Sequence, residues 1–146
     1  MRNSVFIALA GIFILVNSCE ENSNDPGYNR LCKKWILTGF QYQDSLSIET
    51  PPENIPQMNI EFEKSGAMNA ISSCNVFQGS YFLYDTDSIK IEDLISTLKL
   101  CMGEEVMDWE LIYFQGLKNA VQYLIEENKL TIRASTNYNL YFIKDE

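Results

Sequence analysis

The sequence predicts a domain of the α+β class. Most of the chain after residue 28 consists of short segments rich in aromatic and β-branched residues, and these alternate with turn-forming Gly, Pro, Asn and Asp. This arrangement is typical of strands joined by tight connections. Only residues 104–118 carry apolar side chains at helical spacing. One helix among many strands defines the α+β class.

The first predicted strand covers residues 33–42, where Trp, Ile, Leu, Thr, Phe and Tyr are concentrated. Residues 44–56 hold three prolines and are predicted to form a loop that cannot join a central ladder. Residues 57–63 alternate polar and apolar side chains, so they are predicted to form a strand with one wet face. The apolar residues expected to face the core are Met58, Ile60 and Phe62.

Further strands are predicted on both sides of the helical segment. Residues 64–66 form a tight turn, and consecutive antiparallel hairpins are expected after it. The remaining predicted strands are residues 67–72, 80–84, 88–92, 121–126, 130–134 and 139–143.

The amphipathic helix is predicted over residues 104–118. Acidic residues lie in its first turns and Lys118 at its end, where each suits the helix dipole. Its apolar stripe is expected to consist of Met107, Leu111, Phe114 and Val121, widened by Val106, Trp109, Tyr113 and Leu117.

The N-terminus resembles a bacterial lipoprotein signal. Arg2 precedes twelve residues, Val5 to Val16, without a polar side chain, which is too short to span a bilayer but suits a signal peptide. The run Val16 to Cys19 then resembles a lipobox, so residues 1–18 are predicted to be removed and Cys19 acylated. An ordinary signal peptide and a buried core segment are the alternatives. Because Glu20 follows the cysteine, an anchor in the outer membrane is favoured.

Residues 19–27 are predicted to be a flexible acidic tether, and residues 28–146 a single domain. The tether resembles the export signals of surface lipoproteins in Bacteroidota-type bacteria, and a plain solvated spacer explains it equally well. The exported protein is therefore expected to face the periplasm or the cell surface.

The composition excludes several functions. The chain of 146 residues contains no histidine, which removes Ser-His-Asp and Cys-His catalysis and zinc sites built on histidine. Its formal net charge is −9, and removal of residues 1–18 would make it −10. Such an acidic chain lacks the basic surface that nucleic-acid binding requires. We expect no nucleic-acid partner.

Three cysteines remain beside Cys19, and residue patterns alone leave their state open. Cys32, Cys74 and Cys101 permit three single pairings with one thiol left over, or three reduced and buried thiols. Export would allow a disulfide.

The run from Ser73 to Tyr81 resembles the Gly-Cys-Asn-x-x-x-Gly-x-Tyr signature of the META/HslJ-like domain family, with serine in place of the first glycine. Other similar elements follow in the family order, from about Leu31 to Ile143. The opening Trp-x-Leu strand is matched by Trp35 and Leu37, and the Thr-x-Met-x-Cys element by residues 97–101, with Lys99 in place of the methionine. The following helix and the closing strands are matched by Met107, Glu110, Phe114, Leu117, Tyr123 and residues 130–132.

This resemblance implies a curved, mostly antiparallel sheet packed against one helix, in an envelope or stress-related protein. It also implies a disulfide between Cys74 and Cys101, and it supplies no catalytic residues. The family motif residues are Trp35, Asn75, Gly79, Tyr81, Thr97 and Glu110. We interpret three of them structurally: Asn75 as a turn residue, Gly79 as a site of positive φ, and Tyr81 as a buried anchor for its hydroxyl.

Paired carboxylates are the remaining catalytic candidates, and we expect them to be solvated. The pairs are Asp85 with Asp87, Glu92 with Asp93, Glu104 with Glu105, and Glu126 with Glu127. The run Asp85 to Ser88 begins like a calcium loop but lacks the glycine and the bidentate glutamate that complete one. We therefore predict no metal, no cofactor and no catalytic residue.

The preferred hypothesis is a non-enzymatic, lipid-anchored envelope protein whose partner is unidentified. One alternative is a small, inhibitor-like module that binds a ligand or a protein with the aromatic side chains of Phe77, Tyr81, Tyr84 and Tyr138. A carboxylate-based hydrolase is the other alternative, and it would need two facing carboxyls in a cleft.

Overall fold

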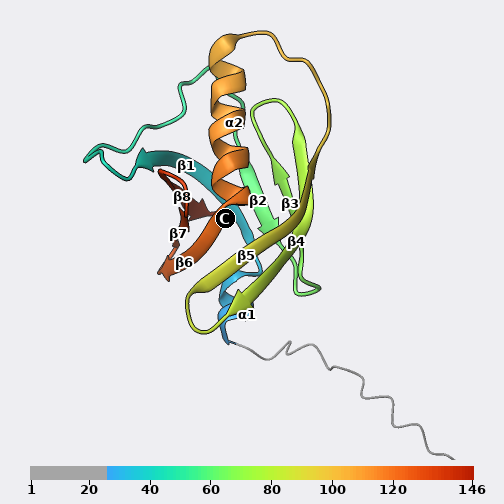
Figure 1. Cartoon of the computed structure of the whole chain (residues 1–146), viewed down its shortest axis with the longest axis vertical. Helices are drawn as coiled ribbons and strands as arrows, with labels where there is room; N and C mark the ends of the chain where they lie inside the picture. Colours follow the sequence, from blue (N-terminus) through green and yellow to red (C-terminus); the bar gives the residue numbers. More distant parts are fainter. Residues whose placement is uncertain (1–25) are drawn as a thin grey trace, which may run out of the picture.

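The computed structural model describes residues 26–146, which form eight strands and two helices (Figure 1). The predicted lipid site Cys19 and the signal peptide lie outside these residues. The strands are β1 (Lys34–Tyr42), β2 (Asn59–Phe62), β3 (Ala67–Ile71), β4 (Val76–Tyr84), β5 (Ser88–Ser96), β6 (Ala120–Glu126), β7 (Lys129–Ala134) and β8 (Tyr138–Lys144). The helices are α1 (Pro26–Leu31) and α2 (Glu104–Lys118).

The expectation of an open curved sheet packed on a helix was wrong, because the strands close into an antiparallel barrel in the order β1 to β8. The closure comes from β1 pairing with β8, in register from Trp35 opposite Lys144 to Tyr42 opposite Tyr138. Alternating side chains indicate which face of a strand is buried, and they carry no information on which strand lies beside it. The pairing of β1 with β8, at the two ends of the domain, therefore could not be predicted from the sequence.

Three β-bulges bend the strands of this small barrel. They lie between Leu37 and Gly39 in β1, between Gln78 and Ser80 in β4, and between Ala120 and Gln122 in β6. A bulge bends its strand and increases the local twist, which helps a sheet of eight strands to close. The pairing between β5 and β6 is short, since these two strands share the single residue pair Ser88 and Gln122.

Helix α2 lies over the barrel interior. Its buried residues Trp109, Tyr113 and Leu117 follow one another every four positions. Trp109 contacts Phe40 of β1 edge to face, with ring centroids 4.8 Å apart, and the hydroxyl of Tyr113 donates a hydrogen bond to the carbonyl of Asn59 at 2.9 Å. The helix therefore contacts both β1 and β2.

The predicted bounds of the helix are confirmed, and its predicted buried face is confirmed in part. Trp109, Tyr113 and Leu117 of the predicted stripe are buried, whereas Val121 lies beyond the helix in β6 and is exposed. Met107 and Leu111 are exposed, and the stripe that enters the core consists of Trp109, Tyr113, Gly116 and Leu117. The predicted inward side chains of Met58, Ile60 and Phe62 are buried.

Helix α1 was not predicted. Trp35, at the start of β1, is fully buried and donates a hydrogen bond from its indole Nε1 to the carbonyl of Leu31 at 2.9 Å. Leu31 itself is buried in the core. The first element of the domain is thus attached to the barrel by the family motif tryptophan.

Candidate functional site

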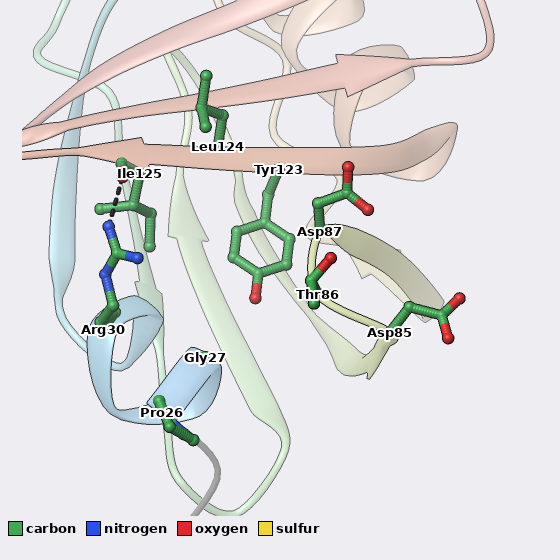
Figure 2. Close-up of a pocket in the computed structure, with 9 residues that line it drawn as sticks. All are labelled: Pro26, Gly27, Arg30, Asp85, Thr86, Asp87, Tyr123, Leu124 and Ile125. Carbon is green, nitrogen blue, oxygen red and sulfur yellow. Dashed lines mark hydrogen bonds between the residues drawn. The ribbon is translucent and has the colours of Figure 1, made fainter.

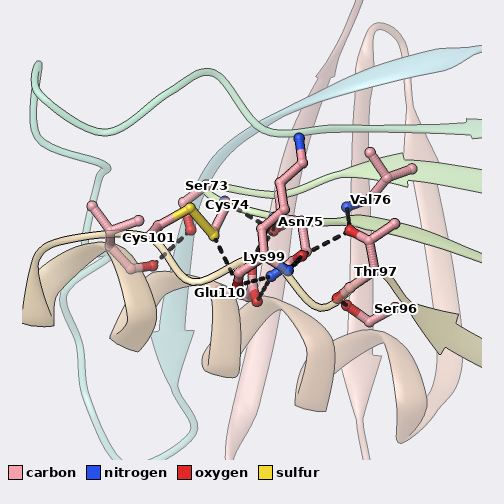
Figure 3. Close-up of a disulfide and its surroundings, with 11 residues drawn as sticks. Ser73, Cys74, Asn75, Val76, Ser96, Thr97, Lys99, Cys101 and Glu110 are labelled. Carbon is pink, nitrogen blue, oxygen red and sulfur yellow. Dashed lines mark hydrogen bonds between the residues drawn. A yellow bond between two sulfur atoms is a disulfide. The ribbon is translucent and has the colours of Figure 1, made fainter.

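Three of the family motif residues, Asn75, Thr97 and Glu110, meet at the segment that leads from β5 to α2 (Figure 3). A disulfide joins Cys74, which precedes β4, to Cys101 in this segment, with a Cα to Cα distance of 5.9 Å. The pairing implied by the family resemblance is confirmed, and Cys32 is the free cysteine among the described residues. The covalent bond holds residues 97–103 against the β3–β4 connection.

Asn75 binds the same segment through its side chain. Its Oδ1 accepts hydrogen bonds from the hydroxyl of Thr97 at 2.7 Å and from the main-chain N–H of Lys99 at 2.8 Å. Its Nδ2 donates to the carbonyl of Lys99 at 3.3 Å. A single carboxamide thus pairs with both main-chain groups of Lys99, as the neighbouring residue of an antiparallel strand would.

Glu110 of α2 completes this network from the helix. Its two oxygens accept hydrogen bonds from the main-chain N–H of Asn75 and from the Nδ2 of Asn75, both at 2.7 Å. The hydroxyl of Ser72 donates to the same carboxylate. Both donors and both acceptors of the Asn75 side chain serve structural bonds, which is why an asparagine is required here.

Ser73, which replaces the glycine of the family signature, makes a bond that glycine could not. Its buried hydroxyl donates to the carbonyl of Val106 in the first turn of α2 at 2.7 Å. Sequence reasoning missed this role, as well as that of Ser72. Their partners lie more than thirty residues away along the chain, so no local pattern signals them.

Residues 97–103, which we call the clamped segment, present apolar side chains to solvent. Leu98, Leu100 and Met102 are 94%, 97% and 95% exposed. We call these three side chains the apolar row. Their alternation with Thr97, Lys99 and Cys101 is visible in the sequence, but alternation alone does not show which side of an extended segment is open. Sequence reasoning did not identify the row as a functional feature.

The remaining motif residues are structural. Tyr81 is buried, and its hydroxyl donates to the carbonyl of Glu63 at 2.7 Å, as predicted. Gly79 does not have the positive φ that we expected. It lies at the β4 bulge, where a Cβ would approach the carbonyl oxygen of Glu92 to 2.8 Å. Close approach of two strands explains this glycine. Asn75 likewise has no positive φ.

The aromatic set proposed for ligand binding divides in two. Phe77 and Tyr81 are buried in the core, whereas Tyr84 is half exposed and Tyr138 is partly buried. Tyr138 packs against Tyr42 with ring centroids 5.1 Å apart. The four side chains therefore form no common surface.

The acidic pairs lie in different parts of the fold: Asp85 and Asp87 at the β4–β5 turn, Glu92 and Asp93 within β5, Glu104 and Glu105 at the start of α2, and Glu126 and Glu127 at the end of β6. Glu104 and Glu105 occupy the first turn of α2, and Glu92 forms an ion pair with Lys90. Between residues 26 and 146, no group of three or more Cys, Asp or Glu side chains is placed to hold a metal ion.

A cavity of about 420 Å³ lies between α1, the β4–β5 turn and β6 (Figure 2). The ring of Tyr123 lies between its two walls, and Arg30 donates a hydrogen bond to the carbonyl of Ile125 on one side. Asp85 and Asp87 line the other side, but their carboxylates point away from Arg30. The cavity therefore does not bring two facing carboxyls together.

Burial has a clear effect on two tyrosines. Tyr113 is enclosed in the core, and this burial raises the pKa of its hydroxyl well above the usual value. Burial, followed by the hydrogen bond with the Cys32 thiol, also raises the pKa of Tyr81. Both hydroxyls stay neutral and serve as structural donors. No helix within residues 26–146 has the length and apolar character needed to cross a bilayer.

The fold and this clamped segment define a class: a small closed antiparallel barrel, covered by one helix, that fixes an extended segment by a disulfide and an Asn–Glu pair. The family model of the META domain matches residues 31–146. The chain belongs to the META domain family.

Two solved structures share this fold. A protein from Burkholderia xenovorans, determined by NMR, is 17% identical with a TM-score of 0.67, over 99% of this chain and 97% of that one. The crystal structure of a DUF4847 family protein from Bacteroides vulgatus is 14% identical with a TM-score of 0.54, over 80% of this chain and 96% of that one. No curated protein matches the chain.

Proposed function

We propose that this chain is an exported, lipid-anchored protein of the bacterial envelope whose META domain acts as a binding module without catalytic activity. The observation that carries the proposal is the disulfide between Cys74 and Cys101, which fixes an extended segment with an apolar outer side. Structural disulfides persist in oxidising compartments such as the periplasm and the cell surface. The bond therefore supports export.

The lipid anchor is supported by the sequence before the described residues. The apolar run Val5 to Val16 and the lipobox ending at Cys19 suit a lipoprotein precursor. A diacylglyceryl group with a further acyl chain would hold the protein stably at a membrane, since stable anchoring needs two hydrophobic attachments. Six residues would then separate Cys19 from Pro26, where the described domain begins.

The absence of catalysis is supported by the way the polar motif residues are used. Glu110 accepts hydrogen bonds from Asn75 and Ser72 on both its oxygens, and the carboxamide of Asn75 is bonded at every position. Groups that are fully bonded inside the protein are poorly placed to act on a substrate. The side chains of Asn75 and Glu110 hold the segment that carries the apolar row.

The anchor is tested by growing cells that produce the full-length protein with radiolabelled palmitate. We expect label in the wild-type protein and in the control variant Cys32→Ala, and none in Cys19→Ala, which should leave the membrane fraction. If Cys19→Ala remained labelled and membrane-bound, the lipid-anchor proposal would be wrong.

A further inference from the structure

The outer edge of the clamped segment is free to pair with another strand. The N–H and C=O groups of Lys99 point inward to Asn75. Successive residues of an extended segment point their main-chain groups to opposite edges, so those of Leu98 and Leu100 point outward. Within residues 26–146 the main-chain groups of Leu98 and Leu100 have no hydrogen-bond partner. The segment is therefore held like an edge strand with one side open.

The apolar row lies along this open segment. Its three side chains are almost fully exposed, and the disulfide and the hydrogen bonds of Asn75 hold the segment that carries them. Extended peptides bind such edges by main-chain hydrogen bonds, while alternate side chains supply specificity. We infer that residues 97–103 are the docking site for an extended segment of a partner protein, with apolar residues at alternate positions and basic residues at one end.

The basic end follows from the charges beside the row. Glu104, Glu105 and Asp108 are exposed in the first turns of α2, which follow Met102 and Gly103, and these three carboxylates outnumber Lys99, the one exposed cation of residues 97–103. A partner with Lys or Arg at the corresponding end would meet complementary charge, and an acidic partner would be repelled. The net charge of −9 on the whole chain acts in the same direction.

A second copy of the chain fits this surface less well. The three side chains of the apolar row offer less area than the roughly 800 Å² that each partner buries in a stable interface. Two copies would also bring their acidic first turns of α2 together. A partner strand that joins the edge and surrounds the row adds main-chain bonds and further contact area.

The bilayer that would hold the proposed lipid anchor is a poor candidate for the occupant of the apolar row. This step rests on the proposed function, and its reason is geometric. The chain from Cys19 to Pro26 can reach roughly 25 Å when fully extended. Helix α2 alone is about 22 Å long, and α1 lies beyond its C-terminal end, whereas the row leads to its N-terminal end (Figure 1). With an anchor next to α1, the row would lie at the opposite end of the domain, where it is open to other proteins.

The test uses intact cells that make the full-length protein with the photoreactive residue p-benzoylphenylalanine at position 100. The matched control carries it at position 46, because Leu46 is as exposed as Leu100 and lies on the β1–β2 connection. We expect one discrete protein adduct from position 100 and none from position 46. Mass spectrometry should place the crosslink in an extended segment of the partner with alternate apolar residues and flanking Lys or Arg. Adding Leu98→Ser and Met102→Ser should lower the adduct yield at least five-fold, while Leu46→Ser should not change it.

The inference is overturned by equal labelling from positions 46 and 100, by an adduct with the mass of two copies of this chain, or by adducts with lipid alone. Thiol counting on each variant verifies that the disulfide, and hence the clamp, is intact. The same experiment in Cys19→Ala separates the two proposals. An adduct that persists there while palmitate labelling is absent from the wild-type protein would remove the anchor and keep the docking site; palmitate labelling without an adduct would remove the docking site alone.

Discussion

Asn75 and Glu110 are joined at two points, since the main-chain N–H and the Nδ2 of Asn75 donate to the two oxygens of one carboxylate, each at 2.7 Å. This pair connects the start of β4 to the middle of α2. Asn75 in turn holds Thr97 and Lys99. The orientation of the helix and that of the clamped segment therefore depend on one side-chain pair.

Replacing Glu110 by glutamine should show the strength of this connection. Glu110→Gln keeps the size of the side chain but places an NH₂ group against a donor, so one hydrogen bond is lost and a partly buried donor is left unpaired. We expect the free energy of unfolding in urea to fall by about 1–3 kcal/mol. The exposed control Glu53→Gln should stay within about 0.5 kcal/mol of wild type. Equal effects of the two substitutions would show that the pair contributes nothing to stability.

The disulfide can be tested together with the acylation of Cys19 by counting thiols in the denatured, unreduced full-length protein. Cys32 contributes one thiol. We expect a single reactive thiol, because Cys74 and Cys101 are joined and a diacylglyceryl thioether at Cys19 does not react. Two thiols would mean that Cys19 is free, and four would exclude the disulfide as well.

Removing the disulfide should destabilise the barrel. Its two cysteines are 27 residues apart in the sequence, and closing such a loop stabilises the folded state by about 3.5 kcal/mol in the chain-entropy model. We expect the double variant Cys74→Ser, Cys101→Ser to lose up to this amount in urea unfolding. Cys32→Ser serves as the control. A loss under about 0.5 kcal/mol would show that hydrogen bonds from Asn75 hold the segment without the covalent bond.

Much of the local structure could be predicted from the sequence. The alternation around Ile60 marks the buried face of β2, and the change of period marks α2 from Glu104 to Lys118. The closure between β1 and β8 could not be predicted, because it depends on pairing between residues about one hundred positions apart. The buried face of α2 was predicted only in part because two apolar stripes overlap, and packing against Phe40 selects the one that contains Trp109.

The candidate site was predictable only as far as its cysteines, and those through the family resemblance. The motif identified Asn75 and Glu110 but not their contact, since they are 35 residues apart. Asn75 was interpreted as a turn residue, and it does lie in the β3–β4 connection, but it is selected for its four side-chain bonds. Gly79 was interpreted as a site of positive φ, whereas it is selected for the close approach of the Glu92 carbonyl. Both roles depend on tertiary contacts, which a local sequence pattern does not encode.

Gly116 illustrates how closely α2 packs on the barrel. A Cβ at this position would lie 2.8 Å from Cδ1 and 2.9 Å from Cγ of the buried Leu140 in β8. Gly116→Ala gains about 1 kcal/mol in helix propensity, but overpacking costs about 1–3 kcal/mol. We expect a net loss of about 1 kcal/mol in thermal or urea unfolding. Adding Leu140→Val should recover part of it, and a stabilised Gly116→Ala would show that the helix can move away from β8.

Alkaline pH should weaken the fold through Tyr113. Burial raises the pKa of its hydroxyl in the folded protein, whereas an unfolded tyrosine ionises near pH 10. Below about pH 10 both states hold the proton, so the stabilisation is fully present there. Above it the unfolded state loses a proton that the folded state keeps, and the free energy of unfolding should fall by up to about 1.4 kcal/mol per pH unit. Tyr113→Phe should reduce this slope, and an unchanged slope between pH 10 and 11.5 would assign the effect to other groups.

Hydrogen exchange should distinguish the two edges of the clamped segment. The amide of Lys99 is bonded to Oδ1 of Asn75 at 2.8 Å, while those of Leu98 and Leu100 have no hydrogen-bond partner in the described part of the chain. In the isolated protein we expect Lys99 to exchange at least about 100-fold more slowly than Leu98 and Leu100, whose open edge faces water. Asn75→Ala should bring Lys99 close to the rate of its neighbours. Strong protection of Leu98 and Leu100 in the isolated protein would mean that this edge is already covered, which would leave no open edge for a partner strand.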